Sequence, residues 1–143
     1  MVEQVSVFLE NKSGRLAELT RALGDGGVNM RALMVADTAE FGVVRVICDR
    51  PRAAVQVLER AGFGASITEV IAVAVPDRPG GLADVLEVLG ARRLNVEYAY
   101  CFVEPSGNAA VDIFRVDDPV AARVALTEAR IVVVDPSEIY IAD

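Results

Sequence analysis

The sequence predicts an α+β fold built from two copies of one small unit, and three observations support this. A loop-like segment that begins Asn11-Lys12-Ser13-Gly14 returns as Asp77-Arg78-Pro79-Gly80. Both segments lie inside the same succession of strand-like and helix-like patterns. Six residues are identical at a constant offset of 66, and such a repeat indicates duplication. The identical pairs are Gly14/Gly80, Leu16/Leu82, Ala17/Ala83, Leu23/Leu89, Gly24/Gly90 and Asn29/Asn95.

Each copy begins with a strand and a helix. Alternating Val5, Val7 and Leu9 predict a strand over 3–9, and the apolar run over 70–75 predicts its counterpart. Helical spacing follows in both copies, with one apolar stripe per helix. The stripes consist of Leu16, Leu19 and Leu23, and of Leu82, Val85, Leu86 and Leu89. We expect Gly24 and Gly90 to end these helices in the left-handed conformation.

The remaining elements complete a strand-helix-strand-strand-helix-strand order in each copy. Pro51 and Pro119 each open a helix, and Asp118 is placed as an N-cap. The sequence therefore predicts tandem ferredoxin-like βαββαβ sandwiches with antiparallel sheets, one over 1–69 and one over 70–143, without a linker. Second strands are expected from 28–30 and 94–96, turns at 37–42 and 105–108, third strands at 43–48 and 110–114, final strands near 65–70 and 131–134, and an extra edge strand at 138–141.

Composition excludes several classes of function. No apolar run reaches the roughly 20 residues needed to cross a bilayer, and the N-terminus has no signal-peptide pattern. We therefore expect a soluble, cytoplasmic protein without a membrane partner. The net charge of −7, without a basic stripe, suits nucleic acid poorly.

Histidine is absent, which removes His-based general catalysis, Ser-His-Asp triads and nearly all zinc-enzyme sites. No pattern points to a cofactor or a metal, so we expect a protein that is not an enzyme. Cys48 and Cys101 lie in apolar, strand-like runs and are expected to be buried free thiols.

The repeated loops are the candidate binding sites, because each lies between a strand end and a helix start. Unpaired N–H groups there favour a carboxylate or phosphate, and glycine lets a ligand approach the backbone. The alternative is a polar turn in which Asn11 or Asp77 only caps the helix. Asn29 and Asn95 follow at the start of each second strand. An amide offers both donor and acceptor, which suits an α-amino acid; the alternative is a turn residue that tolerates left-handed geometry.

The pattern Asn/Asp-x-x-Gly-x-Leu, then a helix, then Val/Leu-Asn-hydrophobic, resembles the ACT domain over essentially the whole chain. Residues 77–83 match best, whereas Ser13 stands where the family usually has proline. The resemblance implies domains paired side by side, with amino acids bound at the interface to regulate biosynthetic enzymes. The implied ligand-binding residues are Asn11, Gly14, Leu16, Asn29 and Met30 in the first copy and Asp77, Gly80, Leu82, Asn95 and Val96 in the second.

Other functions of this fold fit the residues less well. A metallochaperone needs a Cys-x-x-Cys in the first loop, which is absent. Tyr98, Tyr100 and Phe102 alternate as in an RNA-binding sheet, but the chain is acidic and we expect them in the core. An acylphosphatase-like loop needs an arginine; Arg15 is present, yet Gly81 replaces it in the second copy.

The sequence therefore predicts a homodimeric regulatory protein that binds a free amino acid or similar small metabolite and acts on a partner or on its own assembly. The alternative is a non-catalytic structural or regulatory subunit of an amino-acid biosynthesis enzyme, such as acetolactate synthase, with no ligand site of its own.

Overall fold

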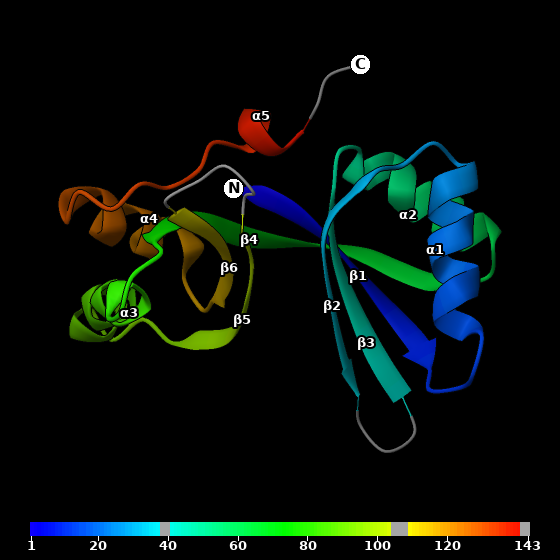
Figure 1. The fold of residues 1–143 in the computed structure, drawn as a ribbon, viewed down its shortest axis with the longest axis horizontal. Helices are drawn as coiled ribbons and strands as arrows, with labels where there is room; N and C mark the ends of the chain where they lie inside the picture. The colour runs from blue at the N-terminus through cyan, green and yellow to red at the C-terminus, as the bar shows by residue number, and fades with distance from the viewer. Residues whose placement is uncertain (38–40, 104–108, 141–143) are drawn as a thin grey trace. The chain divides into compact units, whose positions relative to one another are not determined.

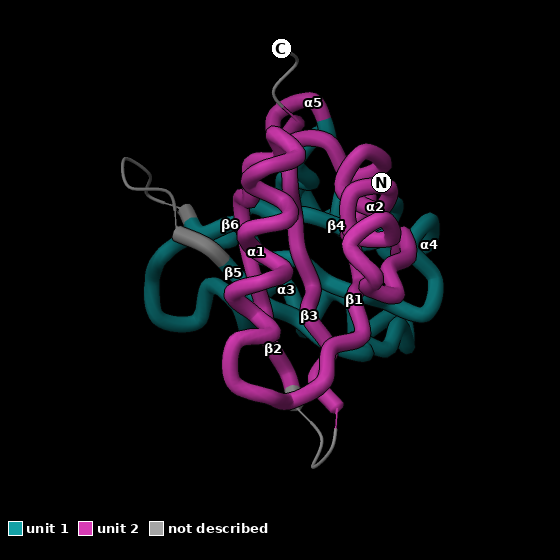
Figure 2. The backbone as a smooth tube through the Cα atoms, turned by 90° about the vertical axis from the view of Figure 1, so that its right-hand side faces the viewer, with its two compact units in different colours: residues 1–2, 69–136 teal, residues 3–68, 137–143 magenta. Residues whose placement is uncertain are grey.

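The computed structural model describes residues 1–37, 41–103 and 109–140, and these form two compact units (Figure 2). The N-terminal unit, magenta in Figure 2, comprises Glu3–Thr68 and the chain from Ser137 onward. The C-terminal unit, teal, comprises Met1–Val2 and Glu69–Pro136. The expected units were 1–69 and 70–143; here the boundary falls between Thr68 and Glu69, and each chain end joins the unit of the other half of the chain. Met1 packs against the core of the C-terminal unit, and the Glu3 N–H donates to the Tyr140 hydroxyl at 2.7 Å in the N-terminal unit.

The N-terminal unit has the strand order β2-β3-β1-β4, with α1 and α2 on one face of the sheet (Figure 1). β3 pairs antiparallel with both β1 and β2. Alternate strand residues point to the helices, so Val5, Val7, Val44 and Val46 form a core with Leu19, Leu23, Ala54 and Leu58. The elements are β1 (Val2–Glu10), α1 (Arg15–Asp25), β2 (Met30–Asp37), β3 (Phe41–Cys48), α2 (Pro51–Arg60) and the first part of β4 (Gly64–Pro76).

The C-terminal unit repeats this arrangement, with the strand order β4-β6-β5 and two helices packed on one face (Figure 1). Its core contains Ile71, Val73 and Val75 from β4, Phe114 and Val116 from β6, and Val85, Leu89, Ala122 and Leu126 from the helices. The elements are the rest of β4, α3 (Gly81–Ala91), β5 (Val96–Val103), β6 (Ala109–Val116), α4 (Pro119–Glu128) and α5 (Pro136–Ile139). The predicted α+β fold with antiparallel, ferredoxin-like order is confirmed.

The helix starts at the two prolines are also confirmed, because α2 begins at Pro51 and α4 at Pro119. The Asp118 carboxylate accepts a hydrogen bond from the Ala121 N–H at 3.0 Å, as expected of an N-cap. The expected turns at 37–42 and 105–108 include residues 38–40 and 105–108, which lie outside the described residues.

The predicted helix ends at Gly24 and Gly90 are wrong. The left-handed residues lie three positions later, at Gly27 (φ 72°) and Arg93 (φ 57°). Each allows the next N–H to reach back to the helix: Val28 donates to the Leu23 carbonyl at 2.9 Å, and Leu94 donates to the Leu89 carbonyl at 3.0 Å. Gly24 and Gly90 are therefore the next-to-last residues of their helices and do not end them.

The end of the chain also differs from the prediction. The segment 131–134 makes one bridge, between Val133 and Val73, instead of a full strand. The expected edge strand over 138–141 is wrong, because Pro136 opens the short helix α5 and buries Ile139; residue 141 lies outside the described residues. Proline has no N–H for a strand ladder but suits a first helical turn.

The buried face of helix α3 is rotated relative to the predicted apolar stripe. Val85 and Leu89 are buried, but Leu82 and Leu86 remain 44% and 38% exposed. The reason is that the buried row starts at Gly81, which lies against the end of β4. In α1, by contrast, Leu16 packs partly buried against the core, as expected. None of the helices in the described part of the chain is long and apolar enough to span a membrane.

Candidate functional site

The loop between β4 and α3 is a tight turn that exposes the start of the helix. The Arg78 N–H donates to the Pro76 carbonyl at 2.9 Å, which places Asp77 at the apex of a three-residue turn. The Gly81 N–H then donates to the Arg78 carbonyl at 3.0 Å. Pro79 followed by Gly80 at φ 84° and ψ −6° is the arrangement of a type II turn.

The loop between β1 and α1 has the same backbone geometry. The Lys12 N–H donates to the Glu10 carbonyl at 2.8 Å, and the Arg15 N–H donates to the Lys12 carbonyl at 3.2 Å. Gly14 adopts φ 88° and ψ −17°. Ser13 therefore occupies the proline position of the turn without changing it.

Both loops leave N–H groups available at the helix start. Neither α1 nor α3 has a side chain that caps its first turn, so the interpretation of Asn11 and Asp77 as helix caps is wrong. In the described residues, no acceptor is bonded to the N–H groups of Leu16 and Ala17, or to those of Leu82 and Ala83. The Asn11 and Asp77 side chains are exposed and belong to the same loops, a few residues before these N–H groups in the sequence. Each loop can thus offer donors to an anion and a polar side chain to a cation.

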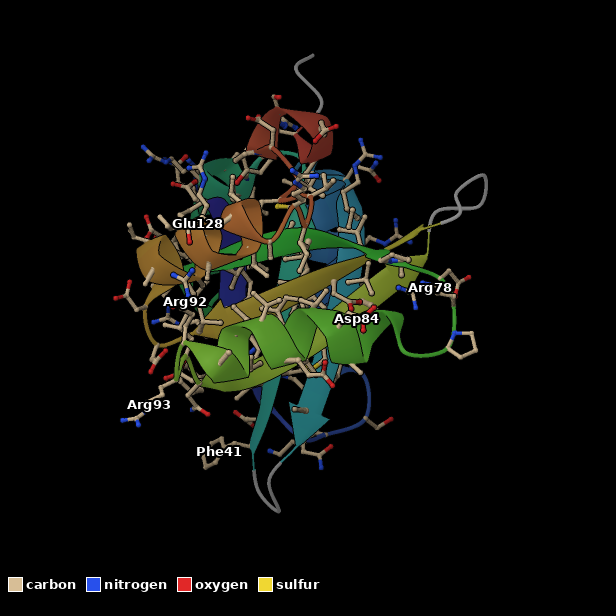
Figure 3. The ribbon with its side chains drawn as sticks, turned by 90° about the vertical axis from the view of Figure 1, so that its left-hand side faces the viewer. Phe41, Arg78, Asp84, Arg92, Arg93 and Glu128 are labelled. Carbon is tan, nitrogen blue, oxygen red and sulfur yellow. The ribbon has the colours of Figure 1, made fainter. Side chains whose placement is uncertain are left out.

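The two loops differ in their charged neighbours. In the C-terminal unit the Arg78 guanidinium bonds the Asp84 carboxylate at 2.7 Å, and Figure 3 shows both at the start of α3. In the N-terminal unit Arg15 lies 4.7 Å from the centre of the Phe63 ring and bonds Glu18 at 2.6 Å. Gly81 takes the place of Arg15, and a Cβ there would lie 2.2 Å from the Pro76 carbonyl oxygen.

Asn29 and Asn95 are held by the same pair of hydrogen bonds. The Asn29 N–H donates to Asp49 Oδ1 at 2.9 Å, and the Asp49 N–H donates back to the Asn29 carbonyl at 3.1 Å. Asn95 and Asp117 make these bonds at 3.1 and 3.2 Å. Neither asparagine has a positive φ, so their interpretation as left-handed turn residues is wrong. Both are exposed, and among the described residues their side-chain amides make no hydrogen bond.

A single unit does not bring the predicted binding residues together. Glu10 pairs with Phe41, so Asn11 lies at that end of the sheet, whereas Met30 pairs with Cys48 at the other end. The seven residue steps of β3 from Phe41 to Cys48 correspond to about 23 Å. The loop residues therefore form one group, and Asn29 and Met30 form a second group at the opposite end of the sheet. The same two groups are separated in the same way in the C-terminal unit. Met30 and Val96 pack partly buried against the two cores.

The sequence reading missed Asp49 and Asp117. They recur at an offset of 68, not 66, because two residues are added before the third strand of the second copy. The signal that could have found them is Asp-x-Pro, which precedes both second helices as Asp49-Arg50-Pro51 and Asp117-Asp118-Pro119.

The cysteines are not activated thiols. Cys48 is buried, and its burial raises the pKa of the thiol to about 11. Cys101 is exposed, so the expectation that both are buried is wrong. Partial desolvation and the neighbouring Asp112 still raise the pKa of the Cys101 thiol, whereas a nucleophilic thiol needs a lowered pKa. In the described residues no group of three or more Cys, Asp and Glu side chains could hold a metal ion.

The aromatic residues of β5 do not join the core as expected. The Tyr98 and Tyr100 rings stack with centroids 6.5 Å apart and remain half-buried, outside the core of the C-terminal unit. They pair with Arg115 and Ile113 on β6, while Ala99, between them, pairs with the core residue Phe114. The tyrosines therefore lie on the sheet face opposite the helices. The Phe102 side chain lies outside the described residues.

A profile of the ACT domain pair matches residues 1–141, so the chain belongs to the ACT domain family, as the loop motifs implied. BT0572 from Bacteroides thetaiotaomicron is 35% identical, with a TM-score of 0.92 over 99% of this chain and 96% of that one. The ligand-free regulatory subunit of aspartate kinase from Thermus thermophilus is 16% identical, with a TM-score of 0.65 over 89% and 91% of the two chains. The aspartokinase alpha and beta subunits match at 14% identity, with a TM-score of 0.60 over 88% and 87%. The last two likenesses show the fold alone. No curated protein sequence matches the chain.

Proposed function

We propose that this protein binds a free amino acid and regulates a partner, or its own assembly, without catalysis. The observation that carries the proposal is the pair of loops with matched turns and available N–H groups at the starts of α1 and α3. Membership of the ACT domain family supports a regulatory role, and two structural relatives are regulatory subunits of aspartate kinase.

The proposed binding mode divides the ligand between two kinds of group. Its carboxylate takes the N–H groups after Gly14 or Gly80, where the helix dipole favours negative charge. Its ammonium is held by Asn11 or Asp77. Asn29 or Asn95 then contributes its amide from a second copy of the chain, since one unit holds the two groups at opposite ends.

The two loops are not equivalent in this proposal. Asp77 carries a full negative charge where Asn11 carries none, so Asp77 adds a Coulombic attraction for the ligand's ammonium to the hydrogen bond that either side chain can accept. We therefore expect the loop of the C-terminal unit to bind an α-amino acid more tightly. Regulation requires that the protein have two conformations or assembly states, and the ligand can shift the balance between them only if it binds one more tightly than the other.

Thermal unfolding in the presence of each of the twenty common amino acids tests the proposal. A ligand at 100 times its Kd adds about 2.7 kcal/mol to the free energy of unfolding, or roughly 5–11 °C in Tm for a chain of this size. Asn29→Ala and Asn95→Ala should weaken binding about 5- to 150-fold, because a polar ligand group is left unpaired. Gln56→Ala, which removes an exposed amide from α2, is the control and should bind normally. If no amino acid raises Tm, the proposal fails and a subunit without a ligand site is the better account.

A further inference from the structure

Asp49 and Asp117 lie in equivalent places and use their side chains in the same way. Each comes directly after the last residue of a third strand and precedes the N-cap of the second helix, which is Arg50 in one unit and Asp118 in the other. Neither carboxylate is used to cap that helix, because α2 has no side-chain cap and α4 is capped by Asp118. Both instead accept the N–H of the asparagine before the second strand, at 2.9 and 3.1 Å.

The position of these asparagines needs such support. Each lies one residue before its strand, and the strand loses its regular pairing at once: the register shifts between Met30 and Ala32, and between Val96 and Tyr98. A bulge leaves its extra residue unpaired and bends the strand. The hydrogen bonds between the strands therefore do not fix the asparagine backbone by themselves. The two bonds to the aspartate hold it instead.

The bonds hold the asparagine backbone and leave its side chain available. The N–H and the C=O of Asn29 are both used by Asp49, and those of Asn95 by Asp117. A neighbouring contact reinforces each arrangement, although only the one in the C-terminal unit involves the aspartate itself. The Arg50 guanidinium donates to the Gly27 carbonyl in the N-terminal unit, and Asp117 Oδ1 also accepts the Asp118 N–H at 3.0 Å in the C-terminal unit.

We propose that Asp49 and Asp117 are positioning residues, which fix the backbone of Asn29 and Asn95 so that each side-chain amide is presented to the ligand. This inference rests on the proposed function. The same two bonds occur in both copies, although the residues at the bulges differ in charge: Arg31 lies two residues after Asn29, and Glu97 lies two residues after Asn95. Retention of the geometry with different neighbours points to a shared requirement of the two sites.

The test is a double-substitution cycle in the full chain. The probes are the twenty common amino acids, titrated one at a time by calorimetry, and the tightest is carried through the variants. Asp49→Ala should weaken binding about tenfold at one of two sites, whereas Asp49→Asn, which keeps an oxygen at Oδ1, should stay within about threefold. The Asp49→Ala/Asn29→Ala double variant should bind no worse than Asn29→Ala, because the aspartate acts through the asparagine.

The C-terminal unit supplies the matched set, Asp117→Ala, Asp117→Asn and Asp117→Ala/Asn95→Ala, so the test survives if one alanine variant fails to fold. Amide hydrogen exchange, measured by NMR without amino acid, gives a second readout: the Asn29 and Asn95 N–H groups should exchange faster in the alanine variants. Additive losses in the double variants, or unchanged exchange, would overturn the positioning role while amino-acid binding stands. Absence of binding to the wild type would overturn the proposed function, and this inference with it.

Discussion

Substitution of Gly81 by alanine tests how tightly the candidate loop of the C-terminal unit is built. The added Cβ would lie 2.2 Å from the Pro76 carbonyl oxygen, more than 1 Å inside ordinary van der Waals contact. That carbonyl cannot move freely, because it accepts the Arg78 N–H at 2.9 Å and Pro76 pairs with Ala109 at the end of the sheet. The clash must therefore displace the start of α3.

The expected cost follows from the behaviour of overpacked sites. Steric insertion into a well-packed place costs about 1–3 kcal/mol of unfolding free energy. For a chain of this length, each kcal/mol corresponds to roughly 2–4 °C, so Gly81→Ala should lower Tm by about 2–12 °C. Because the loop N–H groups move with the helix start, amino-acid binding at this unit should weaken as well.

Circular dichroism melting measures the effect, with Gly90→Ala in the same helix as the matched control. A Cβ at Gly90 meets nothing within 4 Å, and alanine is about 1 kcal/mol better than glycine inside a helix. Gly90→Ala should therefore raise Tm by about 2–4 °C. A Gly81→Ala variant that melts at or above the wild type would show that the loop is not held as described.

Three further predictions concern other parts of the chain. Asp112 is 6% exposed, and burial raises the pKa of its carboxyl above the ordinary 3.8. The folded protein therefore loses stability as the pH rises above 3.8 and the buried carboxyl becomes ionised. Asp112→Asn should raise Tm at about pH 7 but not at about pH 3; a difference independent of pH would contradict this. Asp118→Ala should cost about 1 kcal/mol through loss of the α4 cap, and Asp118→Asn little; equal losses would exclude capping. Leu33 and Val35 on the edge strand β2 are 43% and 47% exposed, so light scattering should report twice the chain mass, and a monomer at micromolar concentration would refute a homodimer.

Local chemistry made part of the fold predictable. Pro119 after Asp118 predicts a capped helix start, and the structure has that start, because both residues act within their own first turn. The repeated motif likewise predicts a glycine-containing loop between strand and helix, and the structure has a turn there, with Gly14 and Gly80 left-handed. In these places the neighbouring residues alone decide the conformation.

Features that depend on packing were not predictable in the same way. The exposure of Leu82 follows from the contact between Gly81 and Pro76, which sets the rotation of α3. Arg93 adopts the left-handed conformation that Gly27 adopts in the other unit, and the preference of residue types for this conformation does not point to an arginine. The candidate site shares this limit, because Asp49 and Asp117 reach the asparagines across about 20 residues of chain.

The most direct test of amino-acid binding by the loops is an NMR titration that follows the first-turn amides. The N–H groups of Leu16, Ala17, Leu82 and Ala83 have no acceptor among the described residues, so a bound carboxylate should take them. With a saturating amino acid, the account predicts that these four amide signals shift among the most in the spectrum, those of the C-terminal unit at lower concentration. An amino acid that binds and leaves all four signals unchanged would contradict the account.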